Sequence, residues 1–104
     1  MPFHIETWDK PDHQQRRQEL RPAHLAFLAR HSTRLLACGA KLHDDGRDAG
    51  GGIYILDTDD RDEAQRFITS DPFHQGDLFR EVRLTRWRKA YVAGQCYLSS
   101  PGAT

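Results

Sequence analysis

The sequence lacks a net charge, a cysteine framework and a long apolar run. Its 104 residues include 15 lysines and arginines and 15 aspartates and glutamates, and this balance argues against a protein that binds nucleic acid by neutralising many phosphates. No run of about 18 apolar residues occurs, so the sequence predicts no transmembrane helix. The N-terminal stretch has no charged segment followed by an apolar one, so we also predict no secretory signal.

Two further absences concern disulfides and metal ligands. Cys38 and Cys96 are far apart and form no CxxC motif, whereas small secreted domains are usually rich in disulfides. We therefore expect a cytoplasmic protein with two free thiols. None of the six histidines belongs to an HxH, HExxH or paired Cys/His motif, so the sequence predicts no metal site.

What is present is a short, polar chain of single-domain size. Apolar residues make up 38% of the sequence and charged residues 29%, so the chain can bury only a modest core. We expect one domain over 1–98 and a frayed, turn-forming tail over 99–104. The net charge is zero, but the charged residues are unevenly distributed along the sequence. Acidic residues are concentrated in 44–62 and basic residues in 80–89.

Hydrophobic periodicity predicts six elements. Apolar residues alternate with polar ones in strands and recur every three or four residues in helices. The predicted strands cover 3–8, 34–42, 52–58 and 81–89, and the predicted helices cover 21–31 and 60–69. The order β-α-β-β-α-β is that of the ferredoxin-like α+β fold, in which both helices cover one face of an antiparallel sheet.

The start of the first helix depends on a proline. Proline in a helix interior costs about 3 kcal/mol, so we expect the regular helix to begin near Arg21, with Pro22 in its first turn. The alternative is a kinked helix that starts after Asp12, a candidate N-cap. The stretch 43–51 is rich in glycine and aspartate and is typical of a turn, which makes the second and third strands a hairpin.

The limits of the second helix depend on polar residues and a second proline. Thr58 or Asp59 is expected to cap its N-terminus. We expect it to end at Asp71, because Pro72 disfavours the helical conformation of the residue before it. A loop follows and leads to the last strand.

The third predicted strand is apolar on both faces. Ile53 and Ile55 lie on one face, and Tyr54 and Leu56 lie on the other. An antiparallel sheet with one face in water should alternate apolar and polar residues, so something must cover the second face. In so short a chain we expect the cover to be a second copy, which gives a homodimer packed sheet to sheet.

His24 is the strongest candidate for acid–base chemistry. It lies on an apolar stripe with Leu20, Phe27 and Leu28, so its ring should point toward the sheet. A hydrogen-bonded core histidine and a general acid or base in a partly desolvated pocket both fit this position. The second role suits an imidazole, whose unperturbed pKa of about 6.5 allows both protonation states at neutral pH.

Asp71 is the carboxylate that could accompany His24. An Asp-Pro pair often does no more than mark the position of a turn. Both helices of the predicted fold lie on one face of the sheet, however, so the end of the second helix can approach the first and bring Asp71 toward His24. Spacing alone leaves that proximity open.

Three stretches of the sequence carry a resemblance to a known family. They are Arg21-Pro22-Ala23-His24-Leu25, the hairpin with its glycine-rich loop, and Asp71-Pro72-Phe73 followed by Gly76. In order and spacing, over about residues 3–91, they are similar to the YCII-related family of small bacterial proteins. The resemblance implies a dimeric α/β barrel and an active site centred on a histidine and an aspartate, which fall on His24 and Asp71. Arg21 matches an arginine of the family and would hold an anionic substrate group or form a plain salt bridge.

Two functions from different classes follow. The first is an enzyme that binds a small anionic or phenolic substrate beside Arg21, Phe73 and His74. In it His24 moves a proton and Asp71 orients the imidazole, as in a dehydrochlorinase-like lyase or an isomerase, without a metal or organic cofactor. The second is a non-catalytic module that binds a metabolite and uses the same pair structurally. We expect neither nucleic acid nor membrane as a partner.

Overall fold

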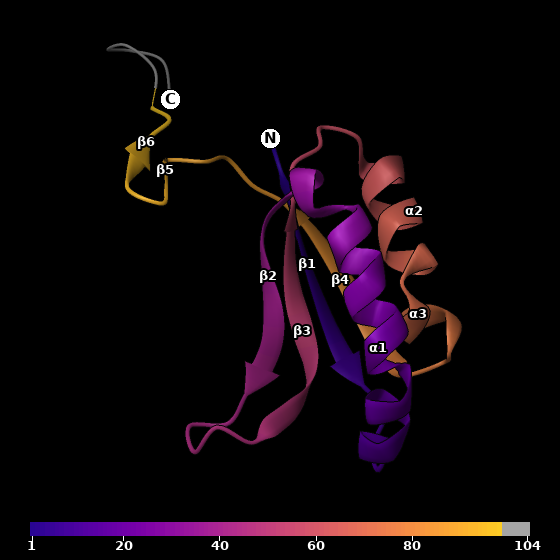
Figure 1. Cartoon of the computed structure of the whole chain (residues 1–104). Coiled ribbons are helices and arrows are strands. Elements are labelled where there is room, and N and C mark those ends of the chain that lie inside the picture. The colour runs from indigo at the N-terminus through magenta and orange to yellow at the C-terminus, as the bar shows by residue number, and fades with distance from the viewer. Residues whose placement is uncertain (99–104) are drawn as a thin grey trace.

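The structure, a computed structural model, describes residues 1–98, so the predicted tail 99–104 lies outside the described residues. A four-stranded sheet, two long helices, two short helices and a C-terminal hairpin make up the described chain (Figure 1). In chain order the elements are β1 (Phe3–Asp9), α1 (Gln14–Arg30), the 3-10 helix η1 (Ser32–Arg34), β2 (Leu35–Leu42), β3 (Asp48–Leu56), α2 (Arg61–Ser70), α3 (Pro72–Gln75), β4 (Phe79–Arg86), β5 (Tyr91–Val92) and β6 (Gln95–Cys96).

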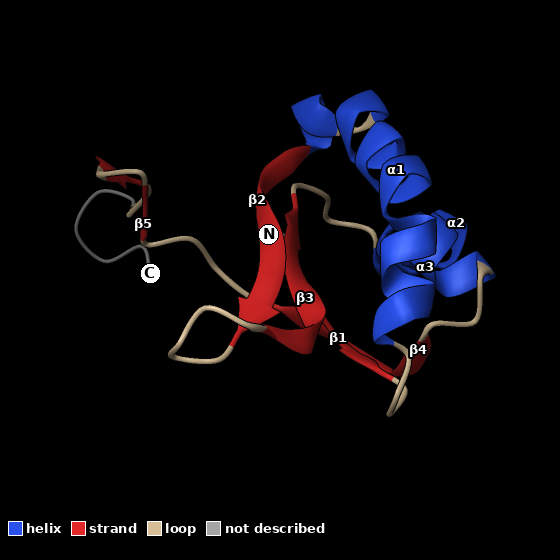
Figure 2. Cartoon of the chain, turned by 60° about the horizontal axis from the view of Figure 1, so that its bottom comes forward, coloured by secondary structure: helices blue, strands red, loops and turns tan. Residues whose placement is uncertain are grey.

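The sheet has the strand order β2-β3-β1-β4, and all its neighbouring strands are antiparallel. Phe3 of β1 pairs with Leu56 of β3 on one side and with Arg86 of β4 on the other. The three α-helices lie on one face of the sheet, and the β5–β6 hairpin projects from the other side (Figures 1 and 2). This confirms the predicted ferredoxin-like α+β fold. No helix in the described chain is both long and apolar enough to cross a membrane.

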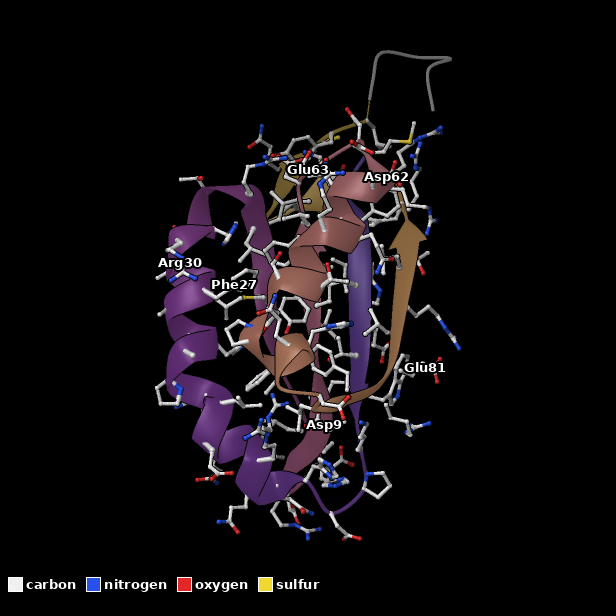
Figure 3. The ribbon with its side chains drawn as sticks, turned by 90° about the vertical axis from the view of Figure 1, so that its right-hand side faces the viewer. Asp9, Phe27, Arg30, Asp62, Glu63 and Glu81 are labelled. Atoms are coloured by element: carbon white, nitrogen blue, oxygen red, sulfur yellow. The ribbon has the colours of Figure 1, made fainter. Side chains whose placement is uncertain are left out.

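The core lies between the helices and the sheet. Alternation along β1 turns Phe3 and Ile5 toward the helices, and both are fully buried. Figure 3 shows Phe27 between α1 and α2 and Arg30 pointing outward. The Phe27 ring lies 5.0 Å from that of Phe67 on α2. The other members of this cluster are Tyr54, Leu56, Ala64 and Ile68.

The first helix begins at Gln14 rather than near Arg21, so the predicted start was wrong. Pro22 lies inside the helix. Asp12 is not the N-cap, since that position is taken by His13, which makes no side-chain capping hydrogen bond.

Solvent and tertiary contacts explain why α1 continues through Pro22. A proline leaves the carbonyl four residues earlier, here that of Gln18, without its helical donor. Pro22 and Gln18 are both exposed, so water can satisfy that carbonyl. The preceding turns are held from outside the helix, because Arg17 donates to the Asp9 carboxylate at 2.9 Å and Arg16 donates to a backbone carbonyl after α3 at 3.2 Å.

The third strand begins at Asp48 rather than at Gly52, so part of the predicted turn belongs to the sheet. Gly51 is the residue that allows this. It lies opposite Trp8 of β1, and a Cβ atom at this position would lie 2.1 Å from the Thr7 carbonyl oxygen. The glycine therefore permits close approach of two strands, and the hairpin turn is confined to the residues between β2 and β3.

The second helix is capped one or two residues later than predicted. Asp60 is its N-cap, in place of Thr58 or Asp59, and the Asp60 side chain accepts a hydrogen bond from the Asp62 backbone N–H at 2.9 Å. The helix ends at Asp71, as predicted. The segment predicted as a loop then forms the short helix α3, and β4 covers 79–86 rather than 81–89.

Candidate active site

Asp71 lies at a junction between two helices. It is the C-cap of α2 and the N-cap of α3, because Pro72 prevents the first helix from continuing but suits the first turn of the next. Its side chain is fully buried. One carboxylate oxygen, Oδ1, accepts a hydrogen bond from the Phe73 backbone N–H at 2.8 Å, and Oδ2 accepts one from the Tyr54 hydroxyl at 2.8 Å. Asp71 is therefore fixed by α3 and by β3.

His24 of α1 meets this carboxylate. Its Nδ1 atom lies 2.9 Å from Oδ1 and 3.0 Å from Oδ2 of Asp71. An ionised carboxylate only accepts hydrogen bonds, so Nδ1 carries the proton and donates it. The Phe73 ring stacks on the imidazole at 3.8 Å and 13°, which fixes the plane of the ring. The proximity that the sequence left open is therefore present.

His24 lines a cavity, and its second ring nitrogen is free of the Asp71 contact. In residues 1–98, Nε2 makes no hydrogen bond to the protein, and it is not one of the fully buried polar atoms without a partner. The cavity has a volume of about 230 Å³ and lies between α1 and the strands β2 and β3. Its lining includes Arg17, Arg21, His24, Cys38, Tyr54 and Phe73. A neutral imidazole oriented in this way can accept a proton from a molecule in the cavity.

Two arginines give the cavity a positive wall. Arg17, Arg21 and His24 are spaced by four and three residues, so they share one face of α1. Arg17 is engaged, since it donates to Asp9 and lies over the Phe73 ring at 4.7 Å. Arg21 lines the cavity and has no ion pair within the described residues, so the salt-bridge alternative for this residue finds no partner there.

Tyr54 and Cys38 line the cavity, and both side chains keep their protons at neutral pH. Burial, together with the charge of Asp71 and the hydrogen bond to it, raises the pKa of Tyr54 well above its ordinary value. The phenol therefore remains a hydrogen-bond donor to Asp71. Cys38 is an exposed residue, but partial desolvation of its thiol raises the thiol pKa, and the charge of Asp71 adds to this effect. A thiol with a raised pKa is a poor nucleophile, so acid–base chemistry at His24 suits the cavity better.

Four of the five residues that the sequence predicted for a site lie together in the structure, and three residues that it did not predict lie beside them. His24, Asp71, Arg21 and Phe73 come together, whereas His74 does not line the cavity and packs against Phe79 at 6.1 Å between ring centroids. Arg17, Cys38 and Tyr54 were not predicted as site residues. The helical spacing from His24 back through Arg21 would have identified Arg17, but the predicted helix began too late to include it.

Within residues 1–98, no group of three or more histidine, cysteine or acidic side chains is arranged to hold a metal ion.

Comparisons with known proteins agree with this architecture. The sequence model of a protein family, the YCII-related domain, matches residues 1–88 of this chain. A solved structure of 5-chloro-2-hydroxyhydroquinone dehydrochlorinase from Burkholderia phenoliruptrix AC1100, in complex with 2,5-dihydroxybenzoquinone, is similar at 30% identity and a TM-score of 0.78, covering 85% of this chain and 94% of that one. A solved antibiotic biosynthesis monooxygenase gives 16% identity and a TM-score of 0.48, with 85% and 98% covered. The comparison with curated protein sequences gives no match.

Proposed function

The chain belongs to the YCII-related domain family, and on that premise we propose that it is a small-molecule enzyme whose acid–base group is His24. The observation that carries the proposal is the orientation of this imidazole. The buried Asp71 carboxylate holds Nδ1–H, while Nε2 faces the cavity. Asp71 orients the ring and stabilises its charged form when Nε2 takes up a proton, as a carboxylate does behind a catalytic histidine.

The proposed substrate is a small anionic or phenolic molecule. Arg21 offers a guanidinium without a protein partner among the described residues, and Phe73 offers part of an aromatic wall. A phenolic hydroxyl placed at Nε2 would lose its proton to His24, and a leaving group would depart with its electron pair, or a double bond would shift. Both reactions are redox-neutral, so they need no metal or organic cofactor for their electron balance. The similarity to the dehydrochlorinase favours the reaction in which a leaving group departs.

The test replaces His24 and measures turnover. We expect His24→Ala to reduce kcat by roughly 10²–10⁴-fold, because positioned proton transfer contributes about that much. Chloride release from 5-chloro-2-hydroxyhydroquinone, followed by a panel of hydroxylated aromatic acids, provides the assay. His31→Ala is the matched control, since His31 is the C-cap of the same helix, contacts the Phe27 carbonyl through its ring and lies outside this cavity.

Two results would count against this function. Full turnover by the His24→Ala variant would overturn the assignment of the acid–base group. Saturable binding of these compounds without turnover by the unaltered protein would favour the non-catalytic module. A ring titration of His24 by NMR separates the two further, because a catalytic imidazole should respond to ligand.

We propose further that two copies of the chain pack sheet to sheet. The sheet face opposite the helices carries Ile53, which is 37% exposed, together with the half-buried Ile55 and Trp8. Long charged side chains shield part of it, since Lys41 and Arg83 lie over the Trp8 ring at 4.0 and 5.5 Å. A second copy would remove this apolar surface from water.

Sedimentation at micromolar concentration tests the dimer. We expect the unaltered chain to sediment as a dimer and Ile53→Lys to sediment as a monomer, because a buried unpaired charge opposes association. Ala29→Lys, which adds the same charge on the exposed side of α1, should leave the dimer intact. A strictly monomeric unaltered chain would refute this arrangement.

A further inference from the structure

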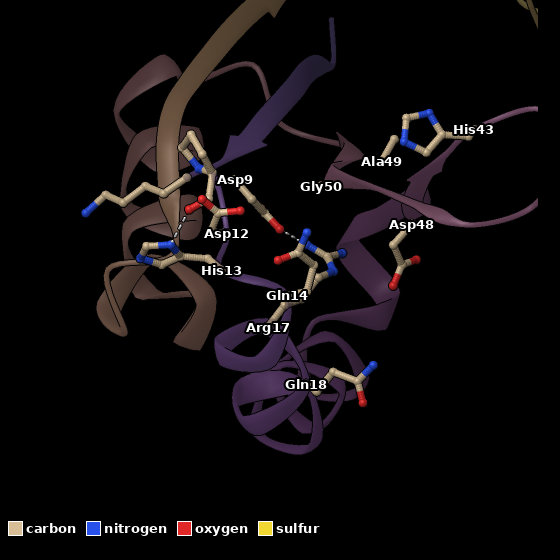
Figure 4. A pocket seen from close by; sticks show the side chains of 12 residues that line it. Asp9, Asp12, His13, Gln14, Arg17, Gln18, His43, Asp48, Ala49 and Gly50 are labelled. Carbon is tan, nitrogen blue, oxygen red and sulfur yellow. Dashed lines mark hydrogen bonds and ion pairs between the residues drawn. The ribbon is translucent and has the colours of Figure 1, made fainter.

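A second cavity lies where β1 ends, α1 begins and β3 starts. Its volume is about 210 Å³, and Figure 4 shows the side chains around it. It is distinct from the cavity at His24, although Arg17 lines both. Acidic, basic and imidazole groups surround it, and the proposed reaction uses none of its carboxylates.

The Asp9 carboxylate is the unusual group in this cavity. Its side chain is 7% exposed, and Oδ2 accepts a hydrogen bond from Arg17 at 2.9 Å (Figure 4). Its other oxygen, Oδ1, is buried and has no hydrogen-bond partner. Buried polar atoms in folded proteins are nearly always paired, so an unpaired oxygen on a carboxylate that borders a cavity points to a donor from outside the chain, which reaches this oxygen when the carboxylate turns.

The surrounding residues do not provide that donor. Arg17 makes no hydrogen bond to Oδ1, because its guanidinium donates instead to Oδ2 of Asp9 and to the Gly51 carbonyl at 3.3 Å. Gly50 packs beside Asp9, where a Cβ atom would lie 3.5 Å from the Asp9 Cβ, and its φ of 79° disfavours any residue with a side chain. The backbone thus leaves open space beside the carboxylate.

The charges that remain unpaired in the cavity are negative. Lys10 pairs with Asp77 outside the cavity at 2.7 Å, and Arg17 pairs with Asp9. Asp12 and Asp48 line the cavity and have no ion-pair partner within residues 1–98.

Asp48 acts on Asp9 through its charge. Burial raises the pKa of the Asp9 carboxyl, Arg17 and Lys41 lower it, and the charge of Asp48 makes a smaller contribution that raises it. A cation in the cavity would offset the effects of burial and of Asp48, whereas an anion would meet the unpaired carboxylates of Asp12 and Asp48.

We propose that this cavity binds a small organic cation that carries a primary ammonium group. One N–H of the ammonium donates to Asp9 Oδ1 after a small rotation of the carboxylate, while Arg17 keeps its bond to Oδ2. The positive charge faces Asp48. An ammonium fits better than a metal ion, because no group of three ligating side chains is arranged for a metal within the described chain. This site goes beyond the proposed acid–base function and does not depend on it.

Titration of the full-length protein with n-propylammonium chloride, followed by ¹H–¹⁵N NMR in 150 mM NaCl, tests the site. We expect saturable shifts at Asp9, Gly50 and the Arg17 side chain, and none with the neutral 1-propanol or the anionic propionate. Asp9→Asn should weaken binding by roughly 10–100-fold, the usual effect of losing a charged hydrogen-bond partner. Glu19→Gln removes the same charge from the exposed surface of α1 and should leave the affinity unchanged.

A second variant guards against misfolding of the first. Asp48→Asn lies at the exposed start of β3 and should weaken n-propylammonium binding several-fold with the fold intact. The proposal is overturned if n-propylammonium causes no saturable shift, which would mean a cavity filled by water alone. It is also overturned if both cavity variants bind n-propylammonium as tightly as Glu19→Gln does, or if propanol binds equally well.

Discussion

Replacing Asp71 by alanine will lower the free energy of unfolding by about 3–5 kcal/mol, the usual cost of breaking a buried charged pair by removing one partner. Asp71 is fully buried and accepts from three donors: the His24 imidazole, the Tyr54 hydroxyl and the Phe73 backbone N–H. Alanine would leave all three donors without the acceptor that they share at this fully buried position. Urea unfolding at a fixed protein concentration measures the loss.

Two companion variants separate charge from shape at this position. Asp71→Asn keeps the shape and one acceptor but places an amide donor against another donor, so we expect a smaller loss of stability, about 1–3 kcal/mol. Tyr54→Phe removes one donor and leaves Asp71 with two, so its cost should be about 1 kcal/mol. A loss below about 1 kcal/mol for Asp71→Ala would mean that the buried network contributes little to stability.

Tyr54 also links this network to pH. Its pKa is raised by burial, with a further contribution from Asp71, so its folded pKa lies above its unfolded value. The stabilisation from the protonated phenol is therefore fully present below the unfolded pKa of about 10 and is lost only as the pH rises through the higher folded pKa. The hydrogen bond from the Tyr54 hydroxyl to Asp71 should therefore keep its proton throughout the neutral range.

A single methyl group at Gly51 will have an effect of similar size. We expect Gly51→Ala to lower the free energy of unfolding by about 3–5 kcal/mol, because overpacking and a left-handed backbone add. The new Cβ atom would lie 2.1 Å from the Thr7 carbonyl oxygen, which belongs to the backbone and cannot move aside without disturbing β1. The φ of 141° at Gly51 adds strain for any residue with a side chain.

The neighbouring strand provides the matched control for Gly51. Gly39 lies on β2, and a Cβ atom there would meet nothing within 4 Å. Gly39→Ala should therefore be neutral or stabilise the fold by about 0.5–1 kcal/mol, since alanine restricts the unfolded chain. Thermal unfolding of both variants checks the contrast. Equal stability of the two would contradict the strand spacing that the structure shows between β1 and β3.

Much of the fold could be predicted because its signals are local. Alternation in 3–8 and 52–58 and helical spacing around His24 depend on neighbouring residues, and so do the helix end at Asp71-Pro72 and the faces that Tyr54 and Ile53 take. The order β-α-β-β-α-β then gave the architecture. The sequence also indicated that His24 would face the sheet.

Other features depend on contacts between residues far apart in the chain. The helix propensity of proline predicted that the helix starts near Pro22. The helix in fact begins earlier, because Pro22 is exposed and because the hydrogen bond from Arg17 to Asp9 stabilises the turns before it. Glycine at 51 suggested a turn, but close packing against Thr7 requires it inside a strand.

The His24–Asp71 pair shows the same division. The sequence by itself determined that the chain has a helix with His24 on its inner face and an Asp-Pro helix end at Asp71. Only the tertiary structure decided that these residues, 47 positions apart, lie 2.9 Å from each other, and that Tyr54 and Arg17 join them. The reason is physical: local patterns fix which face a side chain takes, but the distance between two faces is set by how the helices pack on the sheet.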